Sequence, residues 1–359
     1  MLFYDVFAVL NNLNAGVNGM AGSRLKHILA LAGHSTGLLT VLKQVRLRGG
    51  AVIFMYHRVL LPEAAACHTV QPGMYVSLQN FKRQMGWIQA YFSILPLQEL
   101  VLRLQTNKDI SGCCALTFDD GWVDNYHNVY PIIKQYEIPI TVFLATGFIG
   151  TGKWFWPEKV ADFLFLVASG KTDTGLVSKN LKESLLKNRL FNKKELKTVI
   201  QGYIENLKHY PSNLRQKLLE EMNSACQNDK TLSLRYLMNW NEIREMSSSG
   251  LVDFGSHTVN HRLLDQISPD QAVYEVLNSK DQIELETGQR CLLFAYPNGN
   301  YTGELIHILK ETGMSAAVTT QRGYVTHRRS LSLLELPRIS IHEDVSNSLA
   351  LFLWRILVQ

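Results

Sequence analysis

The stretch Ala115-Leu-Thr-Phe-Asp-Asp-Gly121 decides the fold of this chain and the position of its functional site. It ends a short apolar run that begins at Cys113 and stops at two adjacent carboxylates and a glycine. Such a run is typical of a buried strand whose carboxyl end opens into a polar site. Two carboxylates there need a positive partner, which is a metal ion, an arginine or a helix N-terminus. The rest of the chain is expected to supply that partner.

Further apolar runs alternate with amphipathic segments of helical spacing. Strands are predicted at 51–55, 93–95, 138–144, 252–256, 291–296, 315–319 and 336–341, and helices at 77–92, 96–104, 125–136, 240–249, 269–287 and 303–312. Fully apolar strands that alternate with helices indicate parallel strands covered on their outer face. We therefore predict an α/β barrel, in which the polar residues that follow the strands share one face.

The alternation sets the expected domain boundaries. Residues 49–348 are predicted to form the barrel, and residues 152–236 interrupt it with lysine-rich helices that we interpret as an insertion. Residues 1–48 are predicted to be a helical extension of two segments, broken near residues 16–22, and residues 349–359 a C-terminal tail. A chain of 359 residues is long enough for such a barrel as one unit.

Composition excludes several classes of protein. With 46% apolar and 19% charged residues the chain has ordinary globular composition, not that of a disordered or collagen-like protein. The net charge of +5 is mild, and the basic residues do not gather on a recognisable nucleic-acid-binding module, so no nucleic-acid partner is expected. The five cysteines follow no pairing or zinc-binding pattern, which argues against an oxidising compartment.

The N-terminal region bears on localisation. No stretch approaches the ~20 apolar residues that span a bilayer, and the first residues lack the basic region of a signal peptide. We therefore expect a location in the cytoplasm or at the cytoplasmic face of the membrane. Residues 23–48 are basic and amphipathic, which predicts either peripheral membrane contact through residues 1–48 or packing against the main domain.

A second group of polar residues follows the predicted strand at 252–256. His257 and His261 are four residues apart, so on one helical turn they present two imidazoles to one ion. Because strand ends share one face of a barrel, both histidines are expected to meet Asp120, and this set is an open site for a divalent metal. Adjacent carboxylates point in different directions, so one of them is expected to bind the ion and the other to accept a proton. The alternative is an Asp-Gly turn with a capping carboxylate and two surface histidines.

Several motifs in order resemble one family. TFDDG (117–121), SHTVNH (256–261) and FAYPNGNY (294–301) resemble the signature motifs of the polysaccharide deacetylases, the family 4 carbohydrate esterases. YHRV (56–59) and LPRI (336–339) resemble its bacterial exopolysaccharide-associated branch. The resemblance implies a distorted (β/α)7 barrel and metal-dependent hydrolysis of an N- or O-acetyl group on a sugar polymer.

The resemblance also implies roles for residues at the motif positions. Asp119 matches the general base, and Asp120, His257 and His261 match the ligands of a divalent metal, most often Zn²⁺, with Co²⁺, Ni²⁺ and Fe²⁺ as alternatives. The loop that contains Tyr296 and Asn298 matches the one that supplies a backbone N–H to the oxyanion, and Asn298 is the expected donor.

The chain departs from the family pattern before Gly299, where many members have an arginine and this sequence has Ala295, Tyr296 and Pro297. We predict that Arg338 replaces that arginine by tethering Asp119 from the last strand. The late histidine that serves as general acid in many members is predicted to be His342, with a loop histidine as the alternative reading. His57 lies at the same end of the barrel and is a candidate outer partner of the site.

Aromatic residues near these motifs could recognise the substrate. Trp122, Trp154 and Trp156 could present ring faces to sugars, or could anchor the insertion to the barrel. The predicted function is hydrolytic deacetylation of an N-acetylated polysaccharide, or of its precursor. The alternatives are an O-acetyl esterase, an amidohydrolase acting on a C–N bond outside sugars, and a glycan-binding protein with a decayed site.

Overall fold

The computed structural model describes residues 20–67, 69–71, 73–169, 193–210, 212–225, 236–327 and 332–358. The first helical segment predicted for residues 1–48, which precedes the expected break near residues 16–22, therefore lies outside the described residues. Parts of the predicted insertion, residues 170–192 and 226–235, are also outside them.

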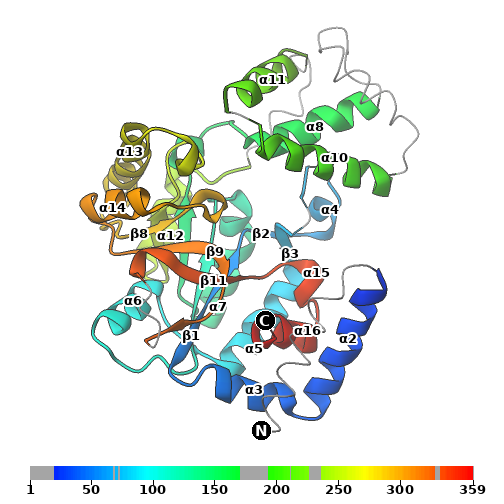
Figure 1. Ribbon diagram of the computed structural model, residues 1–359, viewed down its shortest axis with the longest axis vertical. Helices are drawn as coiled ribbons and strands as arrows, with labels where there is room; N and C mark the ends of the chain where they lie inside the picture. The colour runs from blue at the N-terminus through cyan, green and yellow to red at the C-terminus, as the bar shows by residue number, and fades with distance from the viewer. Residues whose placement is uncertain are drawn as a thin grey trace.

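Within the described residues, seven parallel strands close into a barrel (Figure 1). Around the ring these strands are β1 (Gly50–Tyr56), β5 (Cys113–Phe118), β6 (Ile140–Leu144), β7 (Val252–Ser256), β8 (Leu293–Ala295), β9 (Ala316–Arg322) and β11 (Leu336–Ser340). The ring closes because β1 pairs in parallel with both β5 and β11. This confirms the predicted distorted (β/α)7 barrel, in which every strand carboxyl end lies on one face.

Short strands extend the barrel. β4 (Ser93–Ile94) pairs in parallel with β5, and β10 (Val325–Thr326) pairs antiparallel with the start of β1. β2 (Arg58–Leu60) and β3 (Tyr75–Ser77) form a separate parallel pair beyond the end of β1.

Helices cover the outside of the strands. They are α5 (Leu78–Tyr91), α6 (Leu97–Gln105), α7 (Tyr130–Tyr136), α12 (Trp240–Ser248), α13 (Pro269–Thr287) and α14 (Gly303–Glu311), with a π-helical turn η1 (Asn125–Val129) leading into α7. Short 3-10 turns η2 (Thr146–Phe148), η5 (Leu264–Gln266), η6 (Pro297–Gly299) and η7 (Leu333–Glu335) lie in the connections. The predicted helix starts are confirmed where polar residues cap them, as Ser268 does for α13 by accepting a hydrogen bond from Gln271 N–H.

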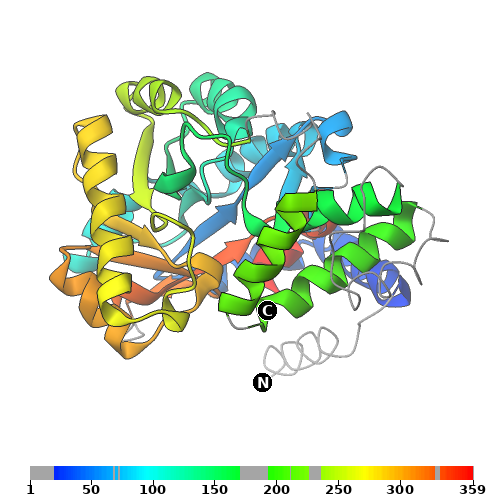
Figure 2. The same ribbon diagram turned by 90° about the horizontal axis from the view of Figure 1, so that it is seen from above.

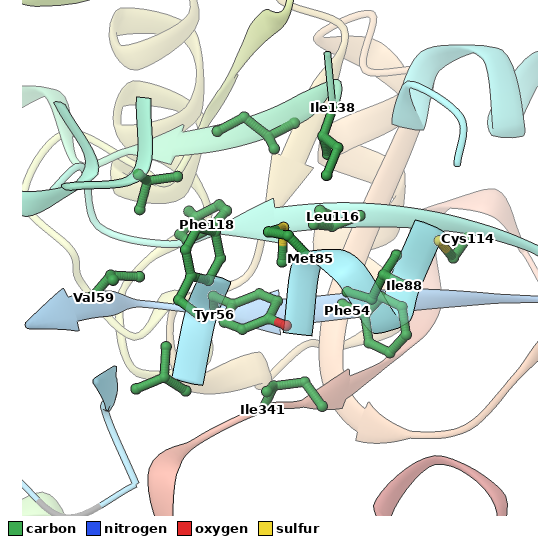
Figure 3. Close-up of a cluster of buried hydrophobic side chains, with 14 of the residues drawn as sticks. Phe54, Tyr56, Val59, Met85, Ile88, Cys114, Leu116, Phe118, Ile138 and Ile341 are labelled. Atoms are coloured by element: carbon green, nitrogen blue, oxygen red, sulfur yellow. The ribbon is translucent and has the colours of Figure 1, made fainter. Parts of the chain in front are cut away.

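An aromatic cluster supports the end of the strand that carries the two carboxylates (Figure 3). Tyr56 and Phe118 are register partners on β1 and β5, and their rings stack with centroids 5.2 Å apart. Phe81 of α5 meets the Tyr56 ring edge-on at 5.6 Å. All three side chains are fully buried, so the point at which the chain leaves β5 is held rigidly.

The two ends of the described chain meet on one side of the barrel (Figure 1). α2 (Met20–Ser35) and α3 (Leu38–Arg46) pack against α16 (Leu349–Leu357), and α15 (Glu343–Ser346) connects α16 to β11. The C-terminal tail predicted for residues 349–359 is therefore wrong for residues 349–357. This segment is apolar almost all round, and a helix of that kind is buried rather than left as a tail.

The break predicted near residues 16–22 lies mostly outside the described residues. α2 begins at Met20, inside the expected break, and the chain turns between α2 and α3 at Gly37, whose φ is 74°. Among the described helices, none is long and apolar enough to span a membrane alone. Residues His27–Ser35 and Leu38–Arg46 meet the length and composition criteria as a pair, bent by 87°.

The described part of the predicted insertion is helical. α8 (Trp156–Ala168), α10 (Lys193–Lys208) and α11 (Ser212–Ala225) share a small apolar cluster of their own, which includes Phe163, Ile204 and Met222. They lie on the opposite side of the barrel from α13 (Figures 1 and 2). A further short helix, α4 (Pro62–Ala65), precedes β3.

Candidate metal centre

The two carboxylates leave β5 at a sharp turn. Asp119 still donates its N–H to Tyr56 O, at 3.0 Å, but Asp120 and Gly121 have φ values of 79° and 82°. A Cβ on residue 121 would lie 2.8 Å from the Leu144 side chain, so a glycine is required there. The turn sends the two aspartate side chains to different partners.

The three predicted metal ligands converge on one point. Asp120 Oδ1 lies 3.5 Å from His257 Nε2 and 3.4 Å from His261 Nε2, and the three ligand atoms lie within 4.8 Å of one another. Tetrahedral Zn²⁺ bound at 2.0–2.1 Å places its ligand atoms roughly 3.3 Å apart. Two imidazoles and a carboxylate with this spacing fit a divalent metal with room for further ligands.

The histidine segment is a loop, so the helical turn predicted for it is wrong. β7 ends at Ser256, and Thr258 and His261 have φ values of 68° and 52°. Glu275 of α13 holds this loop: its Oε2 accepts hydrogen bonds from Val259 N at 2.9 Å and Asn260 N at 2.7 Å. The loop reverses direction at the two left-handed residues, and this brings both imidazoles to Asp120 without a helix.

Further hydrogen bonds orient the ligands. His257 Nδ1 lies 2.7 Å from Ala295 O, so this nitrogen carries the proton and Nε2 presents its lone pair towards Asp120. Trp122 Nε1 donates to Asp120 Oδ2 at 2.8 Å and leaves Oδ1 for the ion.

Burial and the neighbouring charges suit metal binding. Burial raises the pKa of Asp120, but His257, His261 and His57 outweigh it and hold that pKa well below its usual range. Burial, reinforced by His257, lowers the pKa of His261 to about 4. Asp120 is therefore ionised and His261 neutral near pH 7, which are the forms that bind a cation.

Asp119 is held by the predicted arginine. Arg338 Nη1 and Nη2 donate to Asp119 Oδ1 and Oδ2 at 2.7 and 2.6 Å, and Arg338 Nε donates to Thr319 O at 2.9 Å. Both side chains are buried. Burial raises the pKa of Asp119, but the Arg338 guanidinium outweighs it and lowers that pKa overall, so Asp119 stays a carboxylate available to accept a proton.

His57, rather than His342, lies beside this carboxylate. His57 Nε2 is 4.0 Å from Asp119 Oδ2, and its side chain is 16% exposed. Among the described residues, His342 contacts Asp344, at 3.7 Å, and Ser346, whose Oγ donates to His342 O. The sequence placed His57 at this end of the barrel, but spacing alone gave no reason to prefer it to His342.

Two of the three tryptophans predicted to face a sugar are buried. Trp122 is 1% exposed and lies under the Arg58 guanidinium, 4.3 Å from the ring centroid, while Trp154 is 4% exposed and packs on Tyr236 at 4.4 Å. Neither ring offers a face to a ligand. The alternative interpretation, that these residues join the insertion to the barrel, agrees with the contact of Trp122 with Phe155, whose ring centroids are 5.3 Å apart. The contact of Trp154 with Tyr236 lies within the predicted insertion. Trp156 lies under Arg215 within the insertion.

The predicted oxyanion loop is partly buried. The Tyr296 side chain is fully buried and its hydroxyl donates to Leu334 O at 2.9 Å, so it does not contact the site. Asn298 is exposed, with a φ of 58°, and its Nδ2 donates to Asn300 Oδ1. The oxyanion role of the Asn298 backbone N–H remains a prediction.

The insertion reaches the metal centre through residues that the sequence did not single out. The Phe155 ring, at the start of α8, lies 5.0 Å from His261 and 5.3 Å from Trp122. Glu158, one turn further on, is 5% exposed and accepts a hydrogen bond from Gln71 Nε2 at 2.8 Å. A burial pattern of this kind depends on tertiary contacts and leaves no local signal in the sequence.

The fold and the site together define a parallel barrel with a carboxylate–histidine–histidine metal centre and a second, arginine-held carboxylate beside it. The family model described as polysaccharide deacetylase matches residues 106–183 and 199–317, which is more than half of the chain. The chain therefore belongs to the polysaccharide deacetylase family.

Individual relatives agree with this assignment. The chain is 22% identical over 277 residues to YxkH, a protein of Bacillus subtilis (strain 168) that carries the same family name; this covers 76% of the chain and 69% of YxkH. It is 25% identical over 220 residues to the poly-β-1,6-N-acetyl-D-glucosamine N-deacetylase of Staphylococcus aureus, covering 58% of the chain and 69% of that protein.

Solved structures share the fold. The Streptococcus pyogenes deacetylase PplD in complex with acetate superposes with a TM-score of 0.53 at 23% identity, covering 83% of this chain and 95% of PplD. IcaB from Ammonifex degensii has a TM-score of 0.53 at 18% identity, covering 86% of this chain and 97% of IcaB.

Proposed function

We propose that this chain is a metal-dependent deacetylase that hydrolyses the N-acetyl group of a polysaccharide or of its precursor. The observation that carries this proposal is the convergence of Asp120, His257 and His261 within 4.8 Å, with Asp119 held beside them by Arg338. Membership of the polysaccharide deacetylase family supports the reaction class. The N-deacetylase of Staphylococcus aureus among its relatives supports an N-acetylated substrate.

We further propose that the ion is Zn²⁺, which favours two imidazoles and a carboxylate with open positions. When bound, such an ion polarises a carbonyl group and lowers the pKa of water. Asp120, His257 and His261 would hold it, and Ala295 O and Trp122 Nε1 fix the orientation of two of these residues.

The chain's own groups divide the proton transfers. Asp119 accepts a proton from the attacking water, because its carboxylate is ionised and its orientation is fixed by both Arg338 nitrogens. His57 is the group placed to give a proton to the departing amine, since its Nε2 is 4.0 Å from Asp119 Oδ2 and its side chain is 16% exposed. In this assignment His57 replaces His342 as the acid.

Metal analysis combined with acetate release tests the proposal. The metal-loaded protein should release acetate from N-acetylglucosamine oligomers, lose activity on chelation and regain it when Zn²⁺ is restored. Asp119→Asn should retain the metal and lose activity by a factor on the order of 10²–10⁴, whereas His257→Ala should lose the metal as well. His307→Ala, which removes an exposed histidine on α14, is the matched control.

The substrate panel separates the alternatives. Faster release from O-acetylated xylan, or from acetylated amines that are not sugars, would replace the N-deacetylase assignment by an esterase or a general amidohydrolase. Tight glycan binding without turnover by the metal-loaded protein would show a binding protein and contradict the proposal.

A further inference from the structure

The side chain of His261 is oriented differently from those of the other two ligands. Hydrogen bonds orient the other two, because His257 Nδ1 lies 2.7 Å from Ala295 O and Trp122 Nε1 donates to Asp120 Oδ2 at 2.8 Å. A histidine that binds a metal almost always has such a partner on its second nitrogen. Among the described residues, His261 has none, and beyond its contact with Asp120 its imidazole meets two rings. Ring packing therefore sets the angle of this ligand.

The two rings that meet the His261 imidazole belong to His257 and Phe155. The His257 ring lies 4.9 Å away at an interplanar angle of 65°, and the Phe155 ring lies 5.0 Å away at 60°. Both contacts have the edge-to-face arrangement in which aromatic rings attract each other beyond the burial of their area. Because His257 is itself a ligand, Phe155 is the contact that comes from outside the ligand set.

Phe155 also contacts the residue that orients Asp120. Its ring lies 5.3 Å from the ring of Trp122, whose Nε1 donates to Asp120 Oδ2. One side chain therefore packs on one ligand and on the orienting group of a second ligand. Phe155 is 5% exposed, so its ring does not present a face to a substrate.

The first turn of α8 fixes the position of the Phe155 ring. Phe155 is the N-cap residue of this helix, and Pro157 restricts the backbone at its start. The ring packs on Phe148 of η2, with centroids 4.4 Å apart. Glu158, in the same turn, accepts a hydrogen bond from Gln71 Nε2 at 2.8 Å, which ties the helix to the loop before β3. The ring therefore has fixed neighbours on both the insertion and the barrel.

We propose that Phe155 is a positioning residue of the metal centre, whose ring holds the His261 imidazole in the orientation that binds the ion. The insertion, which interrupts the barrel in the sequence, thereby completes the metal centre. This proposal rests on the proposed function for the presence of a metal ion, and it concerns the affinity for that ion. If the ring only packed the insertion against the barrel, its removal would lower stability and leave the affinity for the metal unchanged.

Metal affinity in matched leucine variants tests the proposal. Phe155→Leu removes the ring and keeps an apolar side chain, and Phe163→Leu makes the same change at a buried phenylalanine of α8 in the insertion's own apolar cluster. Competition with a chromogenic chelator should show that Zn²⁺ affinity falls about 3- to 10-fold in Phe155→Leu, which is the size expected for the loss of an edge-to-face ring pair. It should stay at the wild-type value in Phe163→Leu and recover in Phe155→Tyr, which keeps the ring. Equal affinities in wild type and Phe155→Leu, or the same decrease in both leucine variants, would overturn the proposal.

The visible absorption spectrum of the Co²⁺-loaded protein reports the geometry of the ligands without any measurement of activity. It should change in Phe155→Leu and remain that of wild type in Phe163→Leu. These readouts separate this proposal from the proposed function. A metal affinity that depends on Phe155, in a protein that releases no acetate, would retain the positioning role and reject the deacetylase. Acetate release, with the same metal affinity and Co²⁺ spectrum in wild type and Phe155→Leu, would reject the positioning role and retain the deacetylase.

Discussion

Arg338 determines the ionisation of the carboxylate that accepts the proton. Its guanidinium binds both oxygens of Asp119 inside the barrel, where burial alone would raise the pKa of that carboxyl. In Arg338→Gln this pKa should rise, so the acidic limb of the pH profile of kcat/KM should move to higher pH and activity at pH 5 should fall more than activity at pH 8. Acetate release between pH 4 and 9 measures the shift.

The matched control for this experiment is Arg58→Gln. It breaks another buried arginine–carboxylate pair, in which Arg58 Nε donates to Asp124 Oδ2 at 2.9 Å. Both variants should lose stability, by roughly 3–5 kcal/mol, because each leaves a buried charge without its partner. The acidic limb of the pH profile should shift in Arg338→Gln and stay at its wild-type position in Arg58→Gln. A profile that keeps its wild-type limb in Arg338→Gln would contradict the role given to Asp119.

Glu158 makes the stability of the protein depend on pH. Burial, with a further contribution from Asp120, raises the pKa of Glu158 to about 7, against an ordinary value of 4.5. The folded protein therefore binds the proton more tightly than the unfolded chain, so this residue's contribution is complete below about pH 4.5 and is lost as pH rises towards 7. The free energy of unfolding of Glu158→Gln minus that of wild type should therefore increase by up to about 3 kcal/mol from pH 5 to pH 8.

Urea unfolding at a series of pH values measures this difference. Glu304→Gln, which changes an exposed carboxylate of α14, should show no such dependence relative to wild type. Parallel stability curves for Glu158→Gln and wild type would contradict the prediction.

At the scale of elements, α13 and the histidine loop form one unit. Glu275 accepts two backbone hydrogen bonds and one side-chain hydrogen bond from residues 259 and 260, next to the ligand His261. Glu275→Ala should free the loop and weaken metal binding by about 10–100-fold, since residues that orient ligands have effects of this size. Competition with a chromogenic chelator measures the affinity. Asp281→Ala, which changes an exposed carboxylate on the same helix, should bind the metal as wild type does, and equal affinities in both variants would contradict this role.

The elements could be predicted where the signal was local. The helix at 269–287 has its boundaries as predicted, because Ser268 and Gln271 form a capping box that is visible in the sequence. The His257–His261 spacing predicted a helical turn, but the loop is held by Glu275, which is distant in sequence. The sugar-facing roles of Trp122 and Trp154 failed for the same reason, since burial follows from tertiary packing that a sequence pattern does not contain.

At the scale of the whole molecule, the barrel was predictable because each parallel strand has its own apolar run in the sequence. The rule that strand ends share one face of a barrel then places the residues that follow the strands together. That rule also predicted the meeting of Asp120 with two histidines more than 130 residues away. The assembly of α2, α3 and α16 was not predictable, since it pairs the two ends of the chain. Residues 349–357 were predicted to be a tail, and nothing in their sequence indicates that they pack against α2 and α3.

This assembly leaves an apolar surface on α2 and α3, formed by Ile28, Leu31, Val41 and Val45, which are 62%, 47%, 42% and 56% exposed. We expect it to be the membrane contact predicted for the N-terminal region, because a basic amphipathic helix inserts its apolar side at a lipid surface.

The full chain should sediment with anionic phospholipid vesicles, and Ile28→Asp combined with Val45→Asp should lower the bound fraction at least about 10-fold. Leu285→Asp, at a 79% exposed apolar residue on α13, is the matched control. Because Ile28 and Val45 are exposed and are not part of the metal centre, the double variant should still deacetylate soluble oligosaccharides, so sedimentation and activity change independently. Vesicle binding that is absent, or equal in the double variant and the control, would refute the contact.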